Sequence, residues 1–203
     1  MNTETLLPIP LLPHEAAHVA AHESGLLWRA IEPQPKRGNH IQLMLSCDGP
    51  RVDRDGLFAE YSRNITVMRN IQAPYRPNAL YYVQEQYADI LDEDRPDGTP
   101  NVVYAAHPFN SSAGNVGIDR DGCPRSIVEW RTTPMPPEFA RTIIEITKVE
   151  VKQAGRLNFD ESDFMGGPQL DHQAWFVREY KLDPSQWVST WGFLYHYTVK
   201  ERR

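Results

Sequence analysis

Residues 141–152, RTIIEITKVEVK, place the strongest constraint on how this chain folds. Apolar and polar residues alternate along them, which is the pattern of a β-strand with one buried face. The apolar phase runs through Ile144 and Ile146 and then shifts by one residue to Val149 and Val151. A shift of this kind indicates one extra residue in the strand. The segment therefore predicts a long strand with a bulge between Ile146 and Val149.

Further strands are predicted wherever β-branched and aromatic residues alternate with polar ones. These segments are residues 40–47, 65–71, 79–87, 102–106 and 187–200. One helix is predicted from Pro13 to a stop at Gly25, because proline suits a first helical turn. A second helix is predicted from Asp171 to Leu182. Many strands with one helix near each end predict an α+β fold, a small β-barrel with flanking helices.

The remaining segments set the predicted domain organisation. Residues 1–12 are apolar but interrupted by Pro8 and Pro10, which predicts an extended N-terminal arm. Residues 107–125 are dense in Gly, Asn, Ser and Pro, which is typical of a long surface loop. We therefore expect one domain over residues 13–203, with a long loop insertion at 107–125.

Charge and cysteine content exclude several functional classes. The formal net charge is −6, which disfavours binding to extended duplex DNA but allows one nucleoside or a short strand in a pocket. Cys47 and Cys123 are the only cysteines, and their spacing predicts neither a disulfide framework nor a zinc site. No run of apolar residues is long enough to span a membrane, and no signal peptide is recognisable. We expect a cytoplasmic protein without a membrane partner.

The sequence HEAAH, residues 14–18, matches the HExxH pattern of zinc hydrolases. On a helix, His14 and His18 lie one turn apart and Glu15 could act as a general base. The third ligand of the longer HExxHxxGxxH pattern would fall at position 24, which is a serine. His22 extends the same line of side chains instead of converging on one ion. We therefore expect a solvated helix face and no metal, with a zinc site at His14 and His18 as the alternative.

Glu85 is the most informative acidic residue. If residues 81–90 form one strand, Glu85 shares a face with Tyr81, Val83 and Tyr87. An ionised carboxylate in such surroundings finds hydrogen-bond donors or raises its pKa. Two interpretations follow. Glu85 is either a ligand-binding acid in a cleft, or a structural group paired to Arg29 or Arg141.

From Gly25 onward, the order of short motifs resembles the ASCH domain, a member of the PUA-like superfamily. The resemblance is greatest to the longer ASCH proteins of bacteriophages and prophages. It covers about 170 residues and rests on six segments in the same order. They are WRAIEPQP (28–35), YYVQEQY (81–87), VVYAA (102–106), WRTTPMPPEFAR (130–141), LNFDESDF (157–164) and WVSTWGFLYHYTV (187–199).

This resemblance implies a PUA-like barrel and a cleft that accepts a nucleoside or RNA. Small ASCH proteins include an amidohydrolase that removes the acyl group from N4-acetylcytidine with a lysine, a threonine and a glutamate. Glu85 matches the glutamate and is the candidate catalytic residue. The lysine position falls on Ser24 and the threonine position on Leu27. A second alignment places Asn64 and Val67 there instead. Neither alignment restores both catalytic groups, so a degenerate catalytic site is predicted.

We therefore expect a binding protein, without strong catalysis, that holds a nucleobase, modified nucleoside or short single-stranded RNA. No cofactor is expected. The alternatives are an active ASCH-type amidohydrolase or ribonuclease, a phage protein that docks on a host or virion protein, and the zinc hydrolase. The aromatic candidates could stack on a base or belong to the core. The candidate ligand-binding residues are Arg29, Ser24, Tyr82, Tyr87, Trp130 and Arg141.

Overall fold

The computed structural model of the chain describes residues 6–43, 45–46, 49–50, 56–64, 66–90, 101–105, 116–119, 123–127, 129–131, 134–168 and 172–203. The chain divides into two compact units. The first comprises Met1–Glu23, Leu80–Ile144 and Val199–Arg203, and the second comprises Ser24–Ala79 and Glu145–Thr198. Neither unit is continuous in sequence. The elements are mixed α+β and rich in strands, as the sequence predicts.

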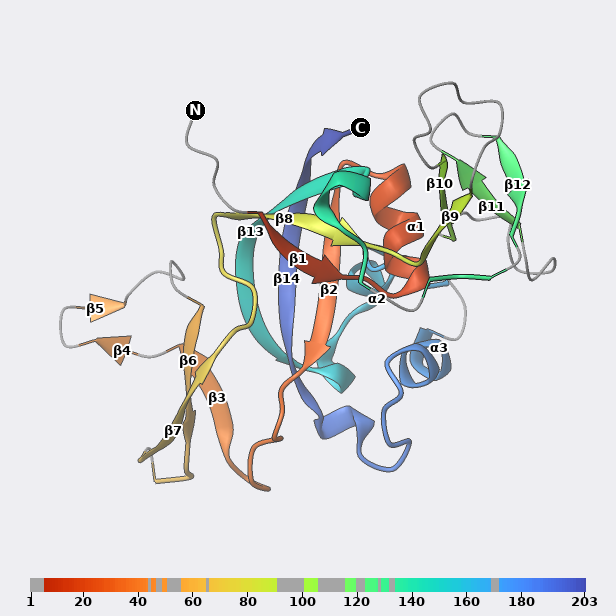
Figure 1. Ribbon diagram of the computed structural model, residues 1–203. Helices are drawn as coiled ribbons and strands as arrows, with labels where there is room; N and C mark the ends of the chain where they lie inside the picture. Colours follow the sequence, from red (N-terminus) through yellow and green to blue (C-terminus); the bar gives the residue numbers. More distant parts are fainter. Residues whose placement is uncertain are drawn as a thin grey trace. The chain divides into compact units, whose positions relative to one another are not determined.

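The largest sheet has the strand order β1-β8-β13-β14-β2. Its strands are β1 (Leu7–Pro10), β8 (Ala79–Gln84), β13 (Thr142–Gln153), β14 (Trp191–Arg202) and β2 (Ser24–Ala30). β1 runs parallel to β8, with Leu7 opposite Tyr81, and β14 runs antiparallel to β2, with Leu194 opposite Trp28 (Figure 1). Among the described strands, this sheet and the smaller ones do not close into a barrel. The expected N-terminal arm contains the edge strand β1.

The first unit also contains the helix α1 (Pro13–Ala21) and a four-stranded antiparallel sheet. The sheet has the order β12 (Pro124–Ser126), β11 (Val116–Asp119), β10 (Asn101–Tyr104) and β9 (Tyr87–Ile90). β11 lies within the predicted loop 107–125 and β12 begins within it, so this part of the segment forms strands. The rest of that loop, residues 107–115 and 120–122, lies outside the described residues. The unit also has the short 3₁₀ helix η1 (Pro137–Phe139).

The second unit contains a three-stranded antiparallel sheet of β3 (His40–Leu43), β6 (Leu57–Tyr61) and β7 (Val67–Gln72). A two-stranded hairpin joins β4 (Leu45–Ser46) to β5 (Gly49–Pro50). Two helices, α2 (Phe159–Asp163) and α3 (His172–Glu179), and two 3₁₀ helices, η2 (Ala154–Arg156) and η3 (Trp187–Ser189), complete the unit. α3 falls inside the predicted helix 171–182. The N-cap of α2 is Asn158, whose Oδ1 accepts a hydrogen bond from the Glu161 N–H.

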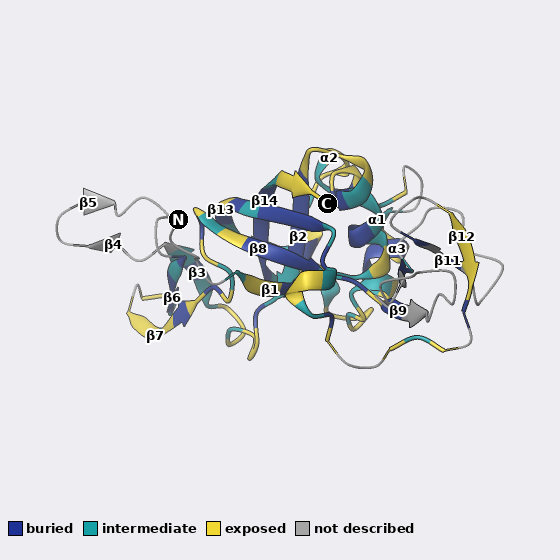
Figure 2. Ribbon diagram, turned by 45° about the horizontal axis from the view of Figure 1, so that its top comes forward, coloured by how far each residue is buried: buried dark blue, intermediate teal, exposed yellow. Residues whose placement is uncertain are grey.

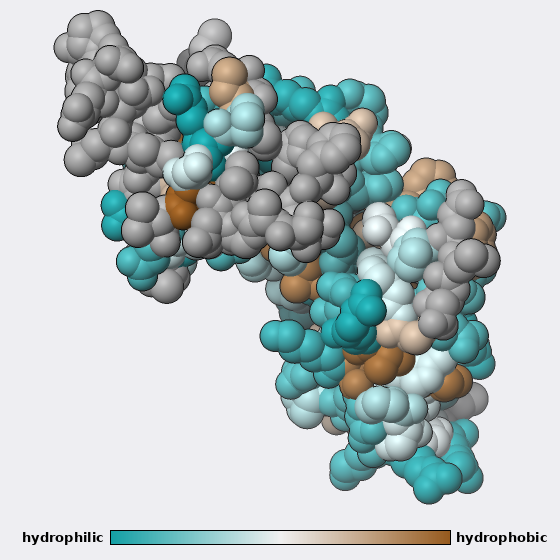
Figure 3. Space-filling view, turned by 90° about the vertical axis from the view of Figure 1, so that its right-hand side faces the viewer, coloured by the Kyte–Doolittle hydropathy of each residue, from teal (hydrophilic) through white to brown (hydrophobic). Residues whose placement is uncertain are grey.

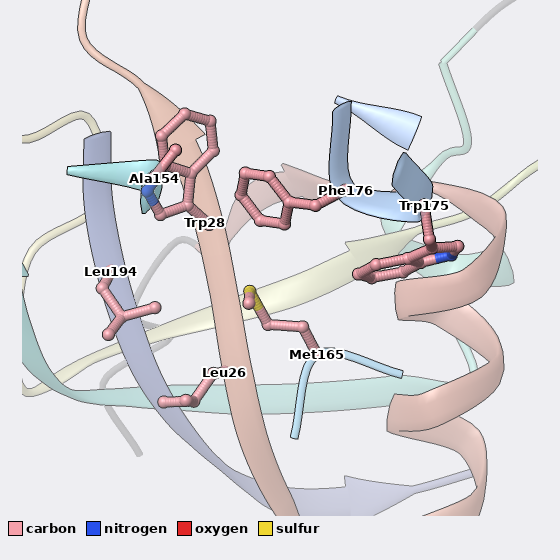
Figure 4. Packing of buried hydrophobic residues seen from close by; sticks show 7 residues of the cluster. All are labelled: Leu26, Trp28, Ala154, Met165, Trp175, Phe176 and Leu194. Atoms are coloured by element: carbon pink, nitrogen blue, oxygen red, sulfur yellow. The ribbon is translucent and has the colours of Figure 1, made fainter. Parts of the chain in front are cut away.

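Trp28 lies at the centre of the main apolar cluster of the second unit. It comes from β2 and is fully buried against Phe176 of α3, with ring centroids 5.1 Å apart in an edge-to-face arrangement (Figure 4). Met165 and Leu194 fill the space beside these rings. The cluster fixes α3 and the segment after α2 to β2 and β14.

Strand β13 shows the predicted change of phase. Ile144 and Ile146 are buried, Thr147 and Lys148 are exposed, and Val149 is buried again. Figure 2 shows buried residues along β8, β13 and β14, whereas β12 is exposed throughout. Strand β13 therefore keeps a buried face along its length although its alternation is interrupted.

None of the helices in the described part of the chain is long and apolar enough to cross a membrane. On the face seen in Figure 3, the described residues are mostly hydrophilic, and apolar residues are confined to small patches. Seven large apolar side chains of the described residues are exposed, and two of them, Phe159 and Phe164, flank α2.

Candidate functional site

Glu85 lies between two strands instead of within one. β8 ends at Gln84 and β9 begins at Tyr87, so the predicted continuous strand over residues 81–90 is wrong at this point. The side chain of Glu85 is 3% exposed and forms a bidentate ion pair with Arg141. Arg141 Nε donates to Oε1 and Arg141 Nη2 donates to Oε2, both at 2.8 Å. Glu85 thus has one of the two structural partners that the sequence proposed.

The ion pair is part of a larger packed arrangement in the first unit. The Arg141 guanidinium carbon lies 4.5 Å from the centroid of the Tyr104 ring, which is a cation–π distance. The Tyr104 hydroxyl donates to the Phe139 carbonyl at 2.8 Å. Burial raises the pKa of Glu85, while the charge and hydrogen bonds of Arg141 oppose that rise. Because Arg141 donates one hydrogen bond to each carboxylate oxygen, this arrangement suits a structural role better than proton transfer.

Two of the three aromatic candidates, Tyr82 and Tyr87, are core residues, and the third, Trp130, is partly buried. Tyr82 and Tyr87 belong to one buried cluster with Tyr104 and Met135. Trp130 packs partly buried on a separate cluster that includes Val103. The described contacts of these three residues are packing contacts within the two clusters.

The other two candidates, Arg29 and Ser24, belong to the second unit and lie on β2. Arg29 Nη1 donates to the carbonyl of Trp28 at 2.8 Å. Ser24 is exposed, lies opposite Thr198 of β14 and lines a groove beside α2.

The HEAAH segment forms the predicted helix α1. The Glu15 carboxylate is buried and accepts a hydrogen bond from the Leu12 N–H at 2.9 Å, so it caps the helix. The rings of His18 and His22 stack with centroids 4.1 Å apart. Arg202 holds the other end of the helix through the carbonyls of Val19 and His22 and an ion pair with Glu23. In the described part of the chain, no three His, Cys, Asp or Glu side chains come together as a metal site would require.

The second unit contains a concave site of about 740 Å³ with a mostly polar lining, which we call the polar cleft. Its walls are the loop 34–39, the segment 185–191 and Gln153 at the end of β13. Two cations, Lys36 and Arg37, line it, and none of its lining residues is acidic. Within the described residues neither cation has an ion-pair partner. The half-buried Trp191 supplies an aromatic wall.

Gln34 fastens the loop 34–39 to the start of β14. Its Nε2 donates to the carbonyls of Ile31 and Trp191, at 2.6 and 2.9 Å, and its Oε1 accepts from the Trp191 N–H at 2.8 Å. The tip of the loop is a turn closed by a hydrogen bond from the Asn39 N–H to the Lys36 carbonyl at 2.9 Å. Gly38 has φ +88° in this turn, a conformation that glycine adopts without strain.

A buried carboxylate on β6, Glu60, supports this turn. Its Oε1 accepts from the Lys36 N–H at 3.0 Å and from Asn39 Nδ2 at 2.6 Å, and its Oε2 accepts from Arg69 Nε at 2.6 Å. Arg69 also donates to the Pro33 carbonyl. Burial by itself raises the pKa of Glu60, but the hydrogen bonds from Asn39, Lys36 and Arg69 outweigh it, so the pKa is lowered. Glu60 thus holds the cationic loop in place while neutralising only Arg69.

We expect Glu60→Gln to lower the free energy of unfolding at neutral pH by about 1–3 kcal/mol, because charge-assisted hydrogen bonds are lost. A lowered folded pKa means that the stabilisation is complete above the ordinary carboxyl pKa of 4.5 and is lost as the pH falls through the folded value. The difference between the wild type and the variant should therefore shrink on acidification. Urea unfolding at several pH values measures this.

The matched control is Glu32→Gln, on an exposed residue that precedes the loop 34–39, with an expected change within about 0.5 kcal/mol. A Glu60→Gln variant as stable as wild type at neutral pH would show that the carboxylate does not support the loop.

Sequence reasoning missed the polar cleft. Its residues come from segments 157 positions apart that meet only through the Gln34–Trp191 hydrogen bonds. The sequence feature that could have indicated the cleft is the turn KRGN, residues 36–39, which places two adjacent cations in a chain of negative net charge. The sequence itself matches no protein-family model, no curated protein and no solved structure.

Proposed function

We propose that this chain is a non-catalytic binding protein that holds short single-stranded RNA, or a nucleotide, in the polar cleft. The observation that carries this proposal is local charge. Lys36 and Arg37 line a cleft without an acidic residue, in a chain with a net charge of −6. Exposed cations concentrated in this way attract the phosphates of a nucleic acid.

The remaining lining groups suit the other parts of a nucleotide. Trp191 offers a ring on which a base can stack, an interaction that tolerates any base. The amides of Asn39, Gln153 and Gln186 offer donors and acceptors to base edges or ribose hydroxyls. The volume of about 740 Å³ falls in the range of ligand-binding pockets. The ligand class is the one expected from the sequence, but the site differs from the expected cleft around Glu85.

The state of Glu85 supports a role in binding without strong catalysis. Its carboxylate is buried, and both of its oxygens accept hydrogen bonds from Arg141, which makes it a poor acceptor for a substrate proton. On the basis of the resemblance to the ASCH domain, we propose that the chain is an ASCH-type protein with a PUA-like fold. We propose also that it acts in the cytoplasm of a phage host. The PQP segment of that resemblance, residues 33–35, leads directly into the cationic turn.

The test is fluorescence anisotropy with a labelled octauridylate. We expect saturable binding by the wild type. In Lys36→Ala/Arg37→Ala the affinity should fall, and the slope of log K against log salt should decrease by about 0.7 for each phosphate that the protein no longer neutralises. Trp191→Ala should weaken binding by about 1–3 kcal/mol, whereas Trp191→Phe should retain most of the affinity.

The matched control is Arg178→Ala/Lys200→Ala, which removes the same charge from exposed residues outside the cleft. Equal affinity and equal salt slope in the cleft variant and this control would contradict the proposal. An absence of binding by the folded wild type would also contradict it.

A further inference from the structure

A second concave site of the second unit lies beside α2, and we call it the α2 groove. It has a volume of about 410 Å³ and is lined by β2, β14, the residues of α2 and Thr147 of β13. Leu26 and Tyr197 contribute buried apolar surface to it. No lysine or arginine is among its lining residues, and it shares no residue with the polar cleft.

The groove exists because the chain after α2 lies directly against β2. The Leu26 N–H donates to the Phe164 carbonyl at 3.0 Å. A Cβ at Gly25 would lie 2.8 Å from that carbonyl and 2.5 Å from the Tyr197 hydroxyl, so only glycine allows this approach. The α2 segment is thereby fixed as one wall, and the paired residues Ser24 and Thr198 form another.

The lining of the groove combines one exposed aromatic ring with acidic side chains. Phe164 is 51% exposed. Asp160 lines the groove, and Asp163 follows one turn later in α2. Neither aspartate has an ion-pair partner within the part of the chain that the structure describes, whereas Glu161 is paired to Lys152. Exposed apolar surface rimmed by polar residues is a feature of protein interaction sites.

One hydroxyl in the wall lacks a partner. Thr198 Oγ1 is inaccessible to solvent and forms no hydrogen bond with any described residue. A buried hydroxyl without a partner costs free energy. Since solvent does not reach this oxygen, a group bound in the groove does not reach it either, and Thr198 contributes only to the shape of the wall.

We propose that the α2 groove binds a peptide segment of a partner protein, in which one large apolar side chain stands next to lysine or arginine. The volume accommodates an aromatic or leucine side chain. The flanking cations complement Asp160 and Asp163, and they can lie over the face of Phe164. Nucleic acid and anionic membrane surfaces are disfavoured by the same acidic rim. This inference is independent of the polar cleft and of what binds there.

The test is an NMR titration of the ¹⁵N-labelled protein with three capped pentapeptides, Gly-Lys-Phe-Lys-Gly, Gly-Glu-Phe-Glu-Gly and Gly-Lys-Gly-Lys-Gly. The first peptide should shift the amide signals of Ser24, Leu26 and Thr198 in a saturable way. The acidic peptide and the peptide without phenylalanine should produce much smaller shifts. Asp160→Asn/Asp163→Asn should weaken binding of the first peptide roughly 3- to 10-fold, since exposed ion pairs contribute less than about 1 kcal/mol each.

A matched variant, Asp160→Glu/Asp163→Glu, keeps the charge and should restore binding. Equal shifts with all three peptides, no saturable shift with the first peptide, or unchanged affinity in the asparagine variant would each overturn the proposal. Because the asparagine substitutions lie on exposed residues, the variant should keep its melting temperature within a few degrees of wild type. Its lower affinity would then be a property of the groove.

Discussion

Replacing Arg141 with methionine is expected to lower the free energy of unfolding by about 3–5 kcal/mol at neutral pH, because it leaves the buried Glu85 carboxylate without a partner. The Glu85 side chain is 3% exposed, and each of its carboxylate oxygens accepts a hydrogen bond from Arg141. Urea unfolding followed by circular dichroism measures the loss. Lys148→Met is the control, since its ion pair with Glu150 is exposed and should contribute less than about 1 kcal/mol.

The cost of Arg141→Met should depend on pH in a defined direction. Burial raises the folded pKa of Glu85 above the ordinary value of 4.5, and Arg141 limits that rise. A raised folded pKa means that the folded protein binds the proton more tightly than the unfolded chain. The contribution to stability is therefore present below pH 4.5 and is lost as the pH rises toward the folded pKa. Without Arg141 the folded pKa rises further, so the variant should be closest to wild type at acidic pH.

A double variant separates the ion pair from simple packing. Glu85→Leu/Arg141→Met removes both charges and should recover most of the stability lost in Arg141→Met. If Arg141→Met were no more destabilising than the Lys148→Met control, or if its cost were the same at pH 4.5 and pH 7.5, the buried pair would not be the structural element described here.

Replacing Trp28 with alanine should lower the free energy of unfolding by about 3–5 kcal/mol, because a large, fully buried aromatic side chain is lost. The indole contacts Phe176 and Tyr180 edge-on, at 5.1 and 5.5 Å between ring centroids. Its removal should loosen α3 from β2, which hydrogen exchange of the α3 amides would detect. Val188→Ala, on an exposed residue, is the control and should change stability by less than about 0.5 kcal/mol.

The packing around Trp28 can be tested further at Gly192. A Cβ at this position would lie 2.1 Å from the Trp28 ring, which is far inside a van der Waals contact. Gly192→Ala should therefore destabilise the wild type strongly and the Trp28→Ala variant only slightly. The coupling between two contacting sites is the quantity that a double-mutant cycle isolates. Additive effects would contradict the close approach of Gly192 to the indole.

Several strands of this fold were predictable because alternation is a local signal. Strand β13, its change of phase and the strands β3, β7 and β10 lie where the pattern places them. Strand β2 was missed because its residues Gly25, Leu26, Leu27 and Trp28 are all buried, so the segment shows no alternation. The sequence of β2 alone does not show that both faces of this strand are buried.

The candidate site was harder to predict because its contacts are long-range. Glu85, at the break between β8 and β9, is paired to Arg141, 56 residues away, and the apolar pattern continues through the break. The sequence proposed Arg141 as one of two partners, but no local pattern distinguishes it from Arg29. The polar cleft depends on the Gln34–Trp191 hydrogen bonds in the same way. The residue types indicate which side chains can carry charge or form hydrogen bonds. They do not indicate which distant segments of the chain lie together in the fold.

We expect a ligand to bind at the polar cleft while Glu85 remains in its ion pair with Arg141. An NMR titration with a 5′-phosphorylated oligouridylate tests both parts, through the Trp191 indole N–H and the amides of residues 36–39, and through the Nε–H of Arg141. We predict saturable shifts of the Trp191 and loop signals and an unchanged Arg141 signal. Shifts at Arg141 with none at Trp191 would place the ligand at the acid instead and would contradict this account.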